Sequence, residues 1–413
     1  MAGPDPSRST AGSPVQRVTF PCVDGLRGVA AISILVFHVA FISGLGFRHR
    51  TLGLFLARLD VGVPLFFVIS GFLLYRPYVT AHLTDQPHPG TSSFLVRRLL
   101  RIVPAYWVVL AVVSFGLGLK HLGGIGGALI YFGFLQIYDN AHAGGGISQA
   151  WSLCTEMTFY LALPAYAWAV RRVARAGRSS RRGVEWCGVI GLYTGGLVVR
   201  AAITFGDLHQ PTDCRLDWLP ATMDLFALGM ALAVASATPP SGGPSRLLRA
   251  VANRWALCWG AAAVAYVAVS AAVFRPADLG RPFSPAQVLW REALYGAIGV
   301  LAVAPAALGD QDRGAGRRFL RSGPLAWAGI VSYGIYLTHN AVIDEYVNHT
   351  HSHLLHLPFP TLLLVTGAAT IPAAVVLHQA VERPAQRAKR RFRDVDVVVP
   401  AAEPASLAPA TAR

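Results

Sequence analysis

The stretch DGLRGVAAISILVFHVAF, from Asp24 to Phe41, decides how this chain folds. It is a nearly unbroken apolar run, close to the length of about 20 residues that a helix needs to cross a bilayer. In an α-helix, Arg27 and His38 would lie on one face, roughly 16 Å apart along the axis. We therefore expect a first membrane-spanning helix with one basic group at the membrane edge and an imidazole deep inside.

The composition extends this expectation to the whole chain. Of its 413 residues, 54% are hydrophobic and only 14% are charged. The formal net charge of +15 comes from Lys and Arg residues that cluster in short segments between apolar runs. Such clusters are typical of cytoplasmic loops, so we expect no nucleic-acid partner. The sequence predicts an all-α fold, a polytopic bundle of membrane helices in contact with the lipid bilayer.

Apolar runs predict about ten transmembrane helices, separated by these basic loops. With both termini cytoplasmic, ten spans place every major basic cluster on the cytoplasmic side of the cell membrane. The short segment 125–138 would invert this arrangement if it crossed, so we predict that it is re-entrant or interfacial and buried against protein. The predicted spans are 26–46, 61–79, 103–119, 149–170, 184–204, 218–237, 255–274, 286–308, 325–345 and 358–379.

We expect one folded domain, a membrane domain over residues 22–392. Residues 1–21 and 393–413 are rich in small and polar residues that cannot bury enough apolar surface to fold alone, so we expect two disordered tails. The five cysteines show neither disulfide nor metal-ligand spacing, and we expect no metal site.

Several ionisable side chains lie inside the predicted spans, where each costs several kcal/mol unless it is paired or faces an aqueous cavity. In two spans, an ionisable residue belongs to a stripe of polar and aromatic residues at helical spacing. Such a stripe indicates a helix face turned toward protein or a cavity. The first stripe is Ser152, Glu156, Phe159 and Tyr160, and the second is Ser332, Tyr336 and His339. The other intramembrane candidates are His38, Arg200, Asp224, Glu292 and His378.

Taken together, these residues resemble the membrane acyltransferase-3 family, polytopic enzymes that decorate bacterial polysaccharides, lipids and some macrolides. The matching motifs follow one another in the order typical of the family and span roughly residues 22–390. They are DGLRGVAAISILVFHVAF, GVPLFFVISGFLL from Gly62, RRLLRIVPAYW from Arg97, WSLCTEMTFYLALP from Trp151, FALGMALA from Phe226, SYGIYLTH from Ser332 and VERP from Val381.

The resemblance implies transfer of an acyl group, usually acetyl from acetyl-CoA, to a hydroxyl group. It implies that His38 is the catalytic histidine and Arg27 its basic partner. The cluster of Arg97, Arg98 and Arg101 would form part of the donor site. Acyl-CoA is then a substrate, and no bound cofactor is expected.

The acceptor implied is a cell-envelope polysaccharide, a glycolipid or a macrolide. Many relatives carry an extracytoplasmic SGNH domain after the last span, and we expect this chain to lack it. Whether a separate extracytoplasmic partner passes the acyl group on is left open.

Physical chemistry agrees with these roles. A neutral imidazole at His38 can act as a general base, and guanidinium groups suit the phosphates of CoA. A transiently acylated His38 is an alternative mechanism. We place Glu156 nearer the outer face, where it would orient His38, stabilise its imidazolium or bind the acceptor. We assign Ser332, Tyr336 and His339 to substrate binding.

A multi-span transporter is the alternative function. Buried charges such as Arg200, Asp224 and Glu292 also mark ion pathways.

Overall fold

The structure, a computed structural model, describes residues 19–177, 179–206, 213–237, 243–273, 283–308 and 312–388. Its regular elements in these ranges are all helices, which confirms the predicted all-α class. The tails predicted over 1–21 and 393–413 fall almost entirely outside the described residues.

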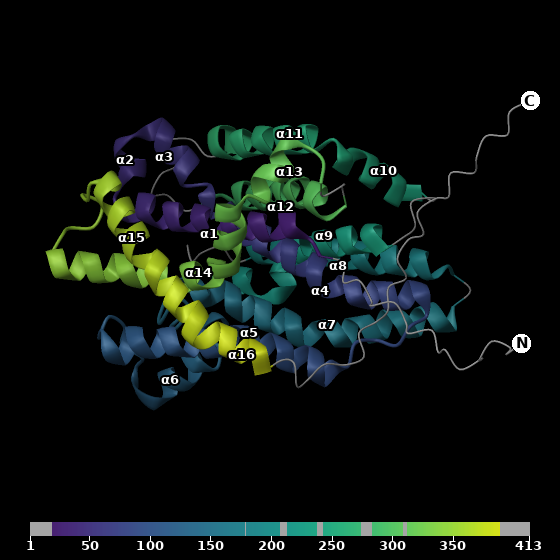
Figure 1. The fold of residues 1–413 in the computed structure, drawn as a ribbon, viewed down its shortest axis with the longest axis horizontal. Coiled ribbons are helices and arrows are strands. Elements are labelled where there is room, and N and C mark those ends of the chain that lie inside the picture. Colours follow the sequence, from purple (N-terminus) through teal and green to yellow (C-terminus); the bar gives the residue numbers. More distant parts are fainter. Residues whose placement is uncertain are drawn as a thin grey trace, which may run out of the picture.

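The long helices run side by side along the longest dimension of the molecule (Figure 1). Shorter ones connect them or lie at the margins. Three five-residue π-helical segments, Val112–Gly116, Val269–Val273 and His378–Glu382, directly follow α5, α11 and α15. The α-helices are α1 (Pro21–Ile42), α2 (Leu45–Arg48), α3 (Arg50–Leu56), α4 (Gly62–Thr84), α5 (Thr91–Ala111), α6 (Gly124–Phe132), α7 (Trp151–Ala176), α8 (Arg181–Gly206), α9 (Leu219–Ala237), α10 (Gly243–Asn253), α11 (Trp255–Ala268), α12 (Pro285–Ala307), α13 (Ala315–Leu320), α14 (Gly323–Thr350), α15 (Phe359–Leu377) and α16 (Arg383–Ala388).

Each predicted span coincides with a helix, but the expected number of about ten spans is not confirmed. Among the described residues, seven helices are long and apolar enough to cross a membrane. An eighth is added if the bent pair formed by α10 and α11 is one span. Helices α7 and α14 are not among the seven, because the polar residues that make them chemically interesting also lower their hydropathy.

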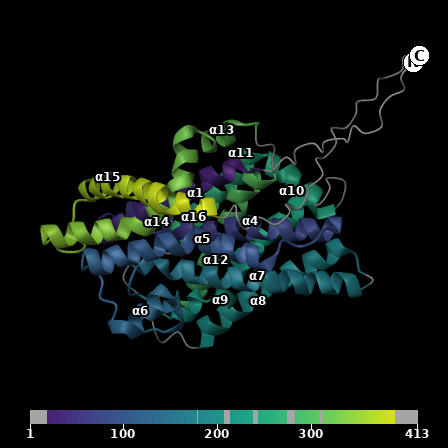
Figure 2. The ribbon, with the colours of Figure 1, turned by 60° about the horizontal axis from the view of Figure 1, so that its bottom comes forward.

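The segment 125–138 forms the nine-residue helix α6 followed by turns. At about 1.5 Å per residue, α6 is too short to cross a bilayer. It lies at the margin of the bundle (Figures 1 and 2). Gly127 and Tyr131 face protein, whereas Ile125 and Leu129 are 82% and 68% exposed, so the expected burial against protein holds for one face only.

Two helix pairs approach each other closely through glycines. A Cβ at Gly71 of α4 would lie 2.2 Å from the carbonyl oxygen of Phe226 in α9, and one at Gly229 would lie 2.0 Å from that of Val68. In the same way, a Cβ at Gly329 of α14 would lie 2.0 Å from the carbonyl oxygen of Asp24 in α1. Small residues at helix crossings are typical of membrane bundles, because they allow the backbones to touch.

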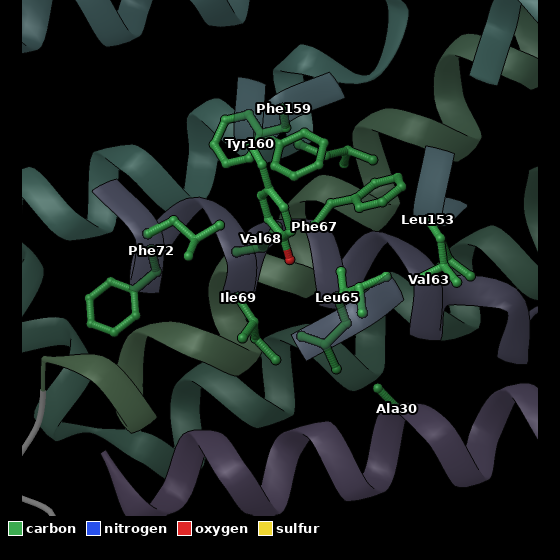
Figure 3. Packing of buried hydrophobic residues seen from close by; sticks show 14 of the residues in the cluster. Ala30, Val63, Leu65, Phe67, Val68, Ile69, Phe72, Leu153, Phe159 and Tyr160 are labelled. Atoms are coloured by element: carbon green, nitrogen blue, oxygen red, sulfur yellow. The ribbon is translucent and has the colours of Figure 1, made fainter. Parts of the chain in front are cut away.

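Helix α4 therefore lies at the centre of the bundle, between α1 on one side and α7 and α9 on the other. Figure 3 shows its apolar side chains Val63, Phe67 and Val68 pointing between the neighbouring helices. The ring of Phe67 stacks on Phe226, and Phe226 stacks in turn on Phe159 of α7. This core fixes α1, α4 and α7 around the cavities described next.

Candidate active site

Two cavities enter the bundle along α1 and meet near its middle. The first lies beside Arg27 and has a volume of about 70 Å³, and the second lies beside His38 and has a volume of about 250 Å³. We call them the arginine cavity and the histidine cavity. Of the residues that line them, three line both: Val63 and Phe67 of α4 and Tyr336 of α14. We call these three residues the septum.

The arginine cavity is rich in cationic groups. Arg27 of α1 and Arg98 and Arg101 of α5 line it, together with the single carboxylate of Glu156. Within the described part of the chain, none of the three arginines forms a hydrogen bond or an ion pair, and the Nε atoms of Arg27 and Arg98 are buried. Buried charges of this kind are costly unless a ligand pairs with them. The cavity is therefore suited to an anionic ligand.

Glu156 lies in this cavity rather than beside His38. Its Oε1 accepts a hydrogen bond of 2.6 Å from the hydroxyl group of Ser70. It also interacts electrostatically with Arg27 and Arg98. This position differs from the one expected from the sequence, because the stripe of α7 faces the arginine side, where Ser152, Glu156 and Tyr160 all line the cavity.

His38 lines the histidine cavity and is backed by a second imidazole. Nε2 of His339 lies 3.1 Å from Nδ1 of His38, and His339 itself is fully buried and lines neither cavity. Nδ1 of His339 faces the carbonyl oxygen of Ile335 at 2.9 Å, and Nδ1 of His38 faces that of Ile34 at 3.0 Å.

These contacts favour one tautomer of each ring. A carbonyl oxygen only accepts hydrogen bonds, so Nδ1 of each imidazole carries a proton. In the neutral pair, Nε2 of His339 is then an acceptor, and the single Nδ1–H of His38 is shared between it and the carbonyl oxygen of Ile34. Nε2 of His38 is left with a free lone pair. The arrangement has the form of a base held by a second group that orients it.

The charged groups of the histidine cavity, in contrast, largely pair with one another. Arg200 of α8 donates to Asp224 of α9 at 2.9 Å and approaches Glu292 of α12 at 3.5 Å. Arg291 also donates to Glu292, at 3.0 Å. These pairs join three helices around the cavity and offset much of the cost of burying ions.

Tyr336 is held in the septum by the start of α7. Its hydroxyl group donates to the carbonyl oxygen of Gln149 at 2.6 Å and lies 2.7 Å from the Oγ of Ser152. The amide of Gln149 donates to the carbonyl oxygens of Tyr336 and Leu337, at 3.1 Å each. The ring that separates the two cavities is thus anchored at both its backbone and its hydroxyl group.

The structure brings some predicted residues together and separates others. Arg27 and His38 share α1 but line different cavities, joined only through the septum. Arg98 and Arg101 line the arginine cavity, whereas Arg97 does not. Ser332 also lines that cavity, with its hydroxyl group donating to the carbonyl oxygen of Gly329 at 2.8 Å.

Sequence reasoning missed several site residues. Three of them lie in the quoted motif GVPLFFVISGFLL: Ser70, which is the partner of Glu156, and the septum residues Val63 and Phe67. None of the three carries a charge that would single it out. Asp60 was missed as well. Its carboxylate lines the histidine cavity and accepts a hydrogen bond from the hydroxyl group of Tyr295.

Comparison with known proteins gives a family match over most of the chain. The sequence profile described as an acyltransferase domain matches residues 20–379. No solved structure matches the chain.

Curated relatives match over shorter stretches. The peptidoglycan O-acetyltransferase OatA of Listeria monocytogenes is 29% identical over 160 residues, covering 35% of this chain and 24% of that protein. The putative membrane-bound transacylase BcsY of Komagataeibacter xylinus is 32% identical over 152 residues, covering 33% and 34%. Nodulation protein 10 of Rhizobium leguminosarum is 33% identical over 138 residues, covering 28% and 35%. The chain thus spans about a quarter to a third of the length of these relatives.

Proposed function

The chain belongs to this acyltransferase family, and from that membership we propose that it transfers an acetyl group from cytoplasmic acetyl-CoA to a hydroxyl group of a cell-envelope acceptor. The acceptor is a polysaccharide, a glycolipid or a macrolide. The relatives named as O-acetyltransferase and transacylase support the reaction class.

The observation that carries the proposal is the contrast between two cavities that meet at a thin septum. Three arginines that form no hydrogen bond or ion pair with the described residues suit the phosphates of a CoA thioester. The histidine cavity, whose charges are largely paired and whose wall includes Trp151, suits a neutral hydroxylated molecule. The donor and the acceptor would bind on opposite sides of the septum, which consists of Val63, Phe67 and Tyr336. Only the acyl group would then have to pass from one cavity to the other.

The proposed chemistry uses the free lone pair of His38. Nε2 of His38 takes the proton of the acceptor hydroxyl group, and the oxygen forms a bond to the thioester carbonyl carbon. The tetrahedral intermediate collapses as the carbon–sulfur bond breaks. The proton then passes from His38 to the sulfur, which releases CoA and leaves the acceptor esterified. Throughout, Nε2 of His339 would accept the hydrogen bond that orients the imidazolium.

The function is tested with membranes that hold the full chain and [¹⁴C]acetyl-CoA. We expect label in the glycan or lipid fraction with the native chain and a loss of about 10²–10⁴-fold with His38→Ala, the range typical of a general base. His353→Ala, which changes an exposed histidine, is the matched control.

Normal transfer by His38→Ala at equal expression would contradict the base assignment. Absence of label from the native chain, together with accumulation of an unmodified solute in vesicles, would instead favour the transporter. Mass spectrometry of envelope glycans and lipids, with and without the gene, would identify the acceptor through a lost acetyl mass.

A further inference from the structure

A third hollow lies at the end of the described chain, outside the two cavities. It is an open groove of about 320 Å³ formed by α16 and the π-helical segment that precedes it. We call it the terminal groove, and its lining residues are His378, Arg383, Gln386 and Arg387. Arg383 and Arg387 are exposed and, within the described residues, form no hydrogen bond or ion pair.

A buried carboxylate interacts with groups of both the groove and the arginine cavity. Glu382 is 3% exposed, and its Oε2 accepts a hydrogen bond of 3.1 Å from Nδ1 of His378 in the groove. It also interacts electrostatically with Arg27 and Arg101 of the arginine cavity. Its Oε1 is buried and has no partner among the described residues. Glu382 thus stands between the two basic sites.

Helix α5 contributes to the arginine cavity and also packs against the elements that form the groove. Both the π-helical segment and α16 pack against α5, which carries Arg98 and Arg101. The two views agree that α16 lies over α5 (Figures 1 and 2). The π-helical register turns Glu382 inward while leaving Arg383 exposed. Such segments are frequently found at functional sites.

The charges of the groove select an anion. Two guanidinium groups and one imidazole line it, while the nearby carboxylate of Glu382 is turned into the protein. Guanidinium groups match the oxygens of a phosphate in a bidentate fashion, and an open groove admits a ligand that extends from a neighbouring cavity.

We propose that the terminal groove binds a phosphomonoester, namely the 3′-phosphate on the nucleotide end of the acyl-CoA donor. This assignment rests on the proposed function, because it places the nucleotide outside the arginine cavity while the thioester reaches the septum. Arg383 and Arg387 would contact the phosphate. Gln386 would line the same groove.

The test uses the full chain in nanodiscs and a pair of donors, acetyl-CoA and acetyl-3′-dephospho-CoA. With the native chain, we expect KM to be about tenfold higher for the dephospho donor, the effect of losing charge-assisted hydrogen bonds. In Arg383→Gln/Arg387→Gln, KM for acetyl-CoA should rise about tenfold and the difference between the donors should vanish. Arg254→Gln/Arg318→Gln, which removes two exposed guanidiniums elsewhere, should leave both values unchanged.

The proposal would be overturned if the double variant raised KM for both donors by the same factor. It would also be overturned if the native chain had the same KM for both donors. Binding of a lipid phosphate in the groove would also overturn the proposal. In that case, phosphatidic acid in the nanodisc would raise the thermal midpoint of the native chain more than that of the double variant. The ratio of KM for the dephospho donor to KM for acetyl-CoA would then be the same in both proteins.

Equilibrium binding of CoA and 3′-dephospho-CoA separates this inference from the proposed function. Tighter binding of CoA that depends on Arg383 and Arg387 would support the groove even if the chain transferred no acetyl group. If the chain transferred acetyl groups but bound CoA and 3′-dephospho-CoA equally well, the proposed function would stand and the assignment of the groove would be wrong.

Discussion

Nε2 of His339 lies 3.1 Å from Nδ1 of His38, although the two residues are 301 positions apart in the sequence. This contact joins α1 to α14 at the end of the histidine cavity. It makes His339 a positioning residue for the imidazole that faces that cavity.

His339→Leu removes the acceptor that orients His38, and we expect kcat to fall about 10²-fold. KM for acetyl-CoA should change little, because His339 lines neither cavity. His339→Gln, whose amide oxygen can accept the same hydrogen bond, should retain more activity than His339→Leu. Steady-state kinetics with both variants check this, and equal losses in the two would argue for a packing role alone.

The septum should limit the length of the acyl group. Val63→Ala shortens one wall between the cavities, so we expect the ratio of kcat/KM for butyryl-CoA to that for acetyl-CoA to rise by roughly 10-fold, the typical worth of a methylene or two in an apolar pocket. Val68→Ala, on the same helix but lining neither cavity, is the control. An unchanged ratio in Val63→Ala would show that the acyl group does not lie at this wall.

Removing Arg200 should destabilise the bundle. Arg200→Met leaves the buried carboxylates of Asp224 and Glu292 without their shared partner, and breaking such a pair costs roughly 3–5 kcal/mol. Adding Asp224→Asn to the variant should recover part of the loss, because Glu292 keeps its ion pair with Arg291. Thermal unfolding in detergent, followed by tryptophan fluorescence, measures both. Arg254→Met, an exposed change, should have little effect, and similar loss in that variant would contradict the prediction.

The loop between α4 and α5 should make stability depend on pH. Nε2 of His88 lies 2.5 Å from Nε2 of His82, which also pairs with Glu185. Burial, together with the charges of His82, Arg171 and Arg175, lowers the pKa of His88 to about 4. Because an unfolded histidine has a pKa of about 6.5, the unfolded chain binds more protons between these values.

Stability should therefore decrease as the pH falls from about 6.5 toward 4, and His88→Gln should reduce this slope. The thermal midpoints of the native chain and of His88→Gln at pH 7, 6 and 5 measure the slope of stability against pH. His353→Gln, which changes an exposed histidine, should keep the native slope. An identical slope in His88→Gln and the native chain would remove His88 as the cause.

The sequence predicted the helices well, because hydropathy and the positions of polar residues are local properties. The face of α7 that carries Ser152 and Glu156 does line a cavity, as its helical spacing indicated. The number of spans was less predictable, because α7 and α14 are too polar to pass as membrane helices by composition.

What could not be predicted was which helices meet. Arg200, Asp224 and Glu292 were each visible as isolated charges, and only their placement on three packed helices shows that Arg200 pairs with both carboxylates. Likewise, nothing in the sequence indicated that Glu156 lies near Arg27, since their separation depends on how α1 and α7 pack on either side of α4.

The septum also bears on the insulation of the membrane. A transferase that works on both sides of a bilayer risks opening a leak for protons and ions, which would dissipate the energy stored across it. Here the two cavities share three lining side chains, two apolar and one tyrosine ring held by hydrogen bonds. Under the proposed function, this shared wall would let an acyl group pass between donor and acceptor, while an ion would meet two apolar side chains and a tyrosine ring.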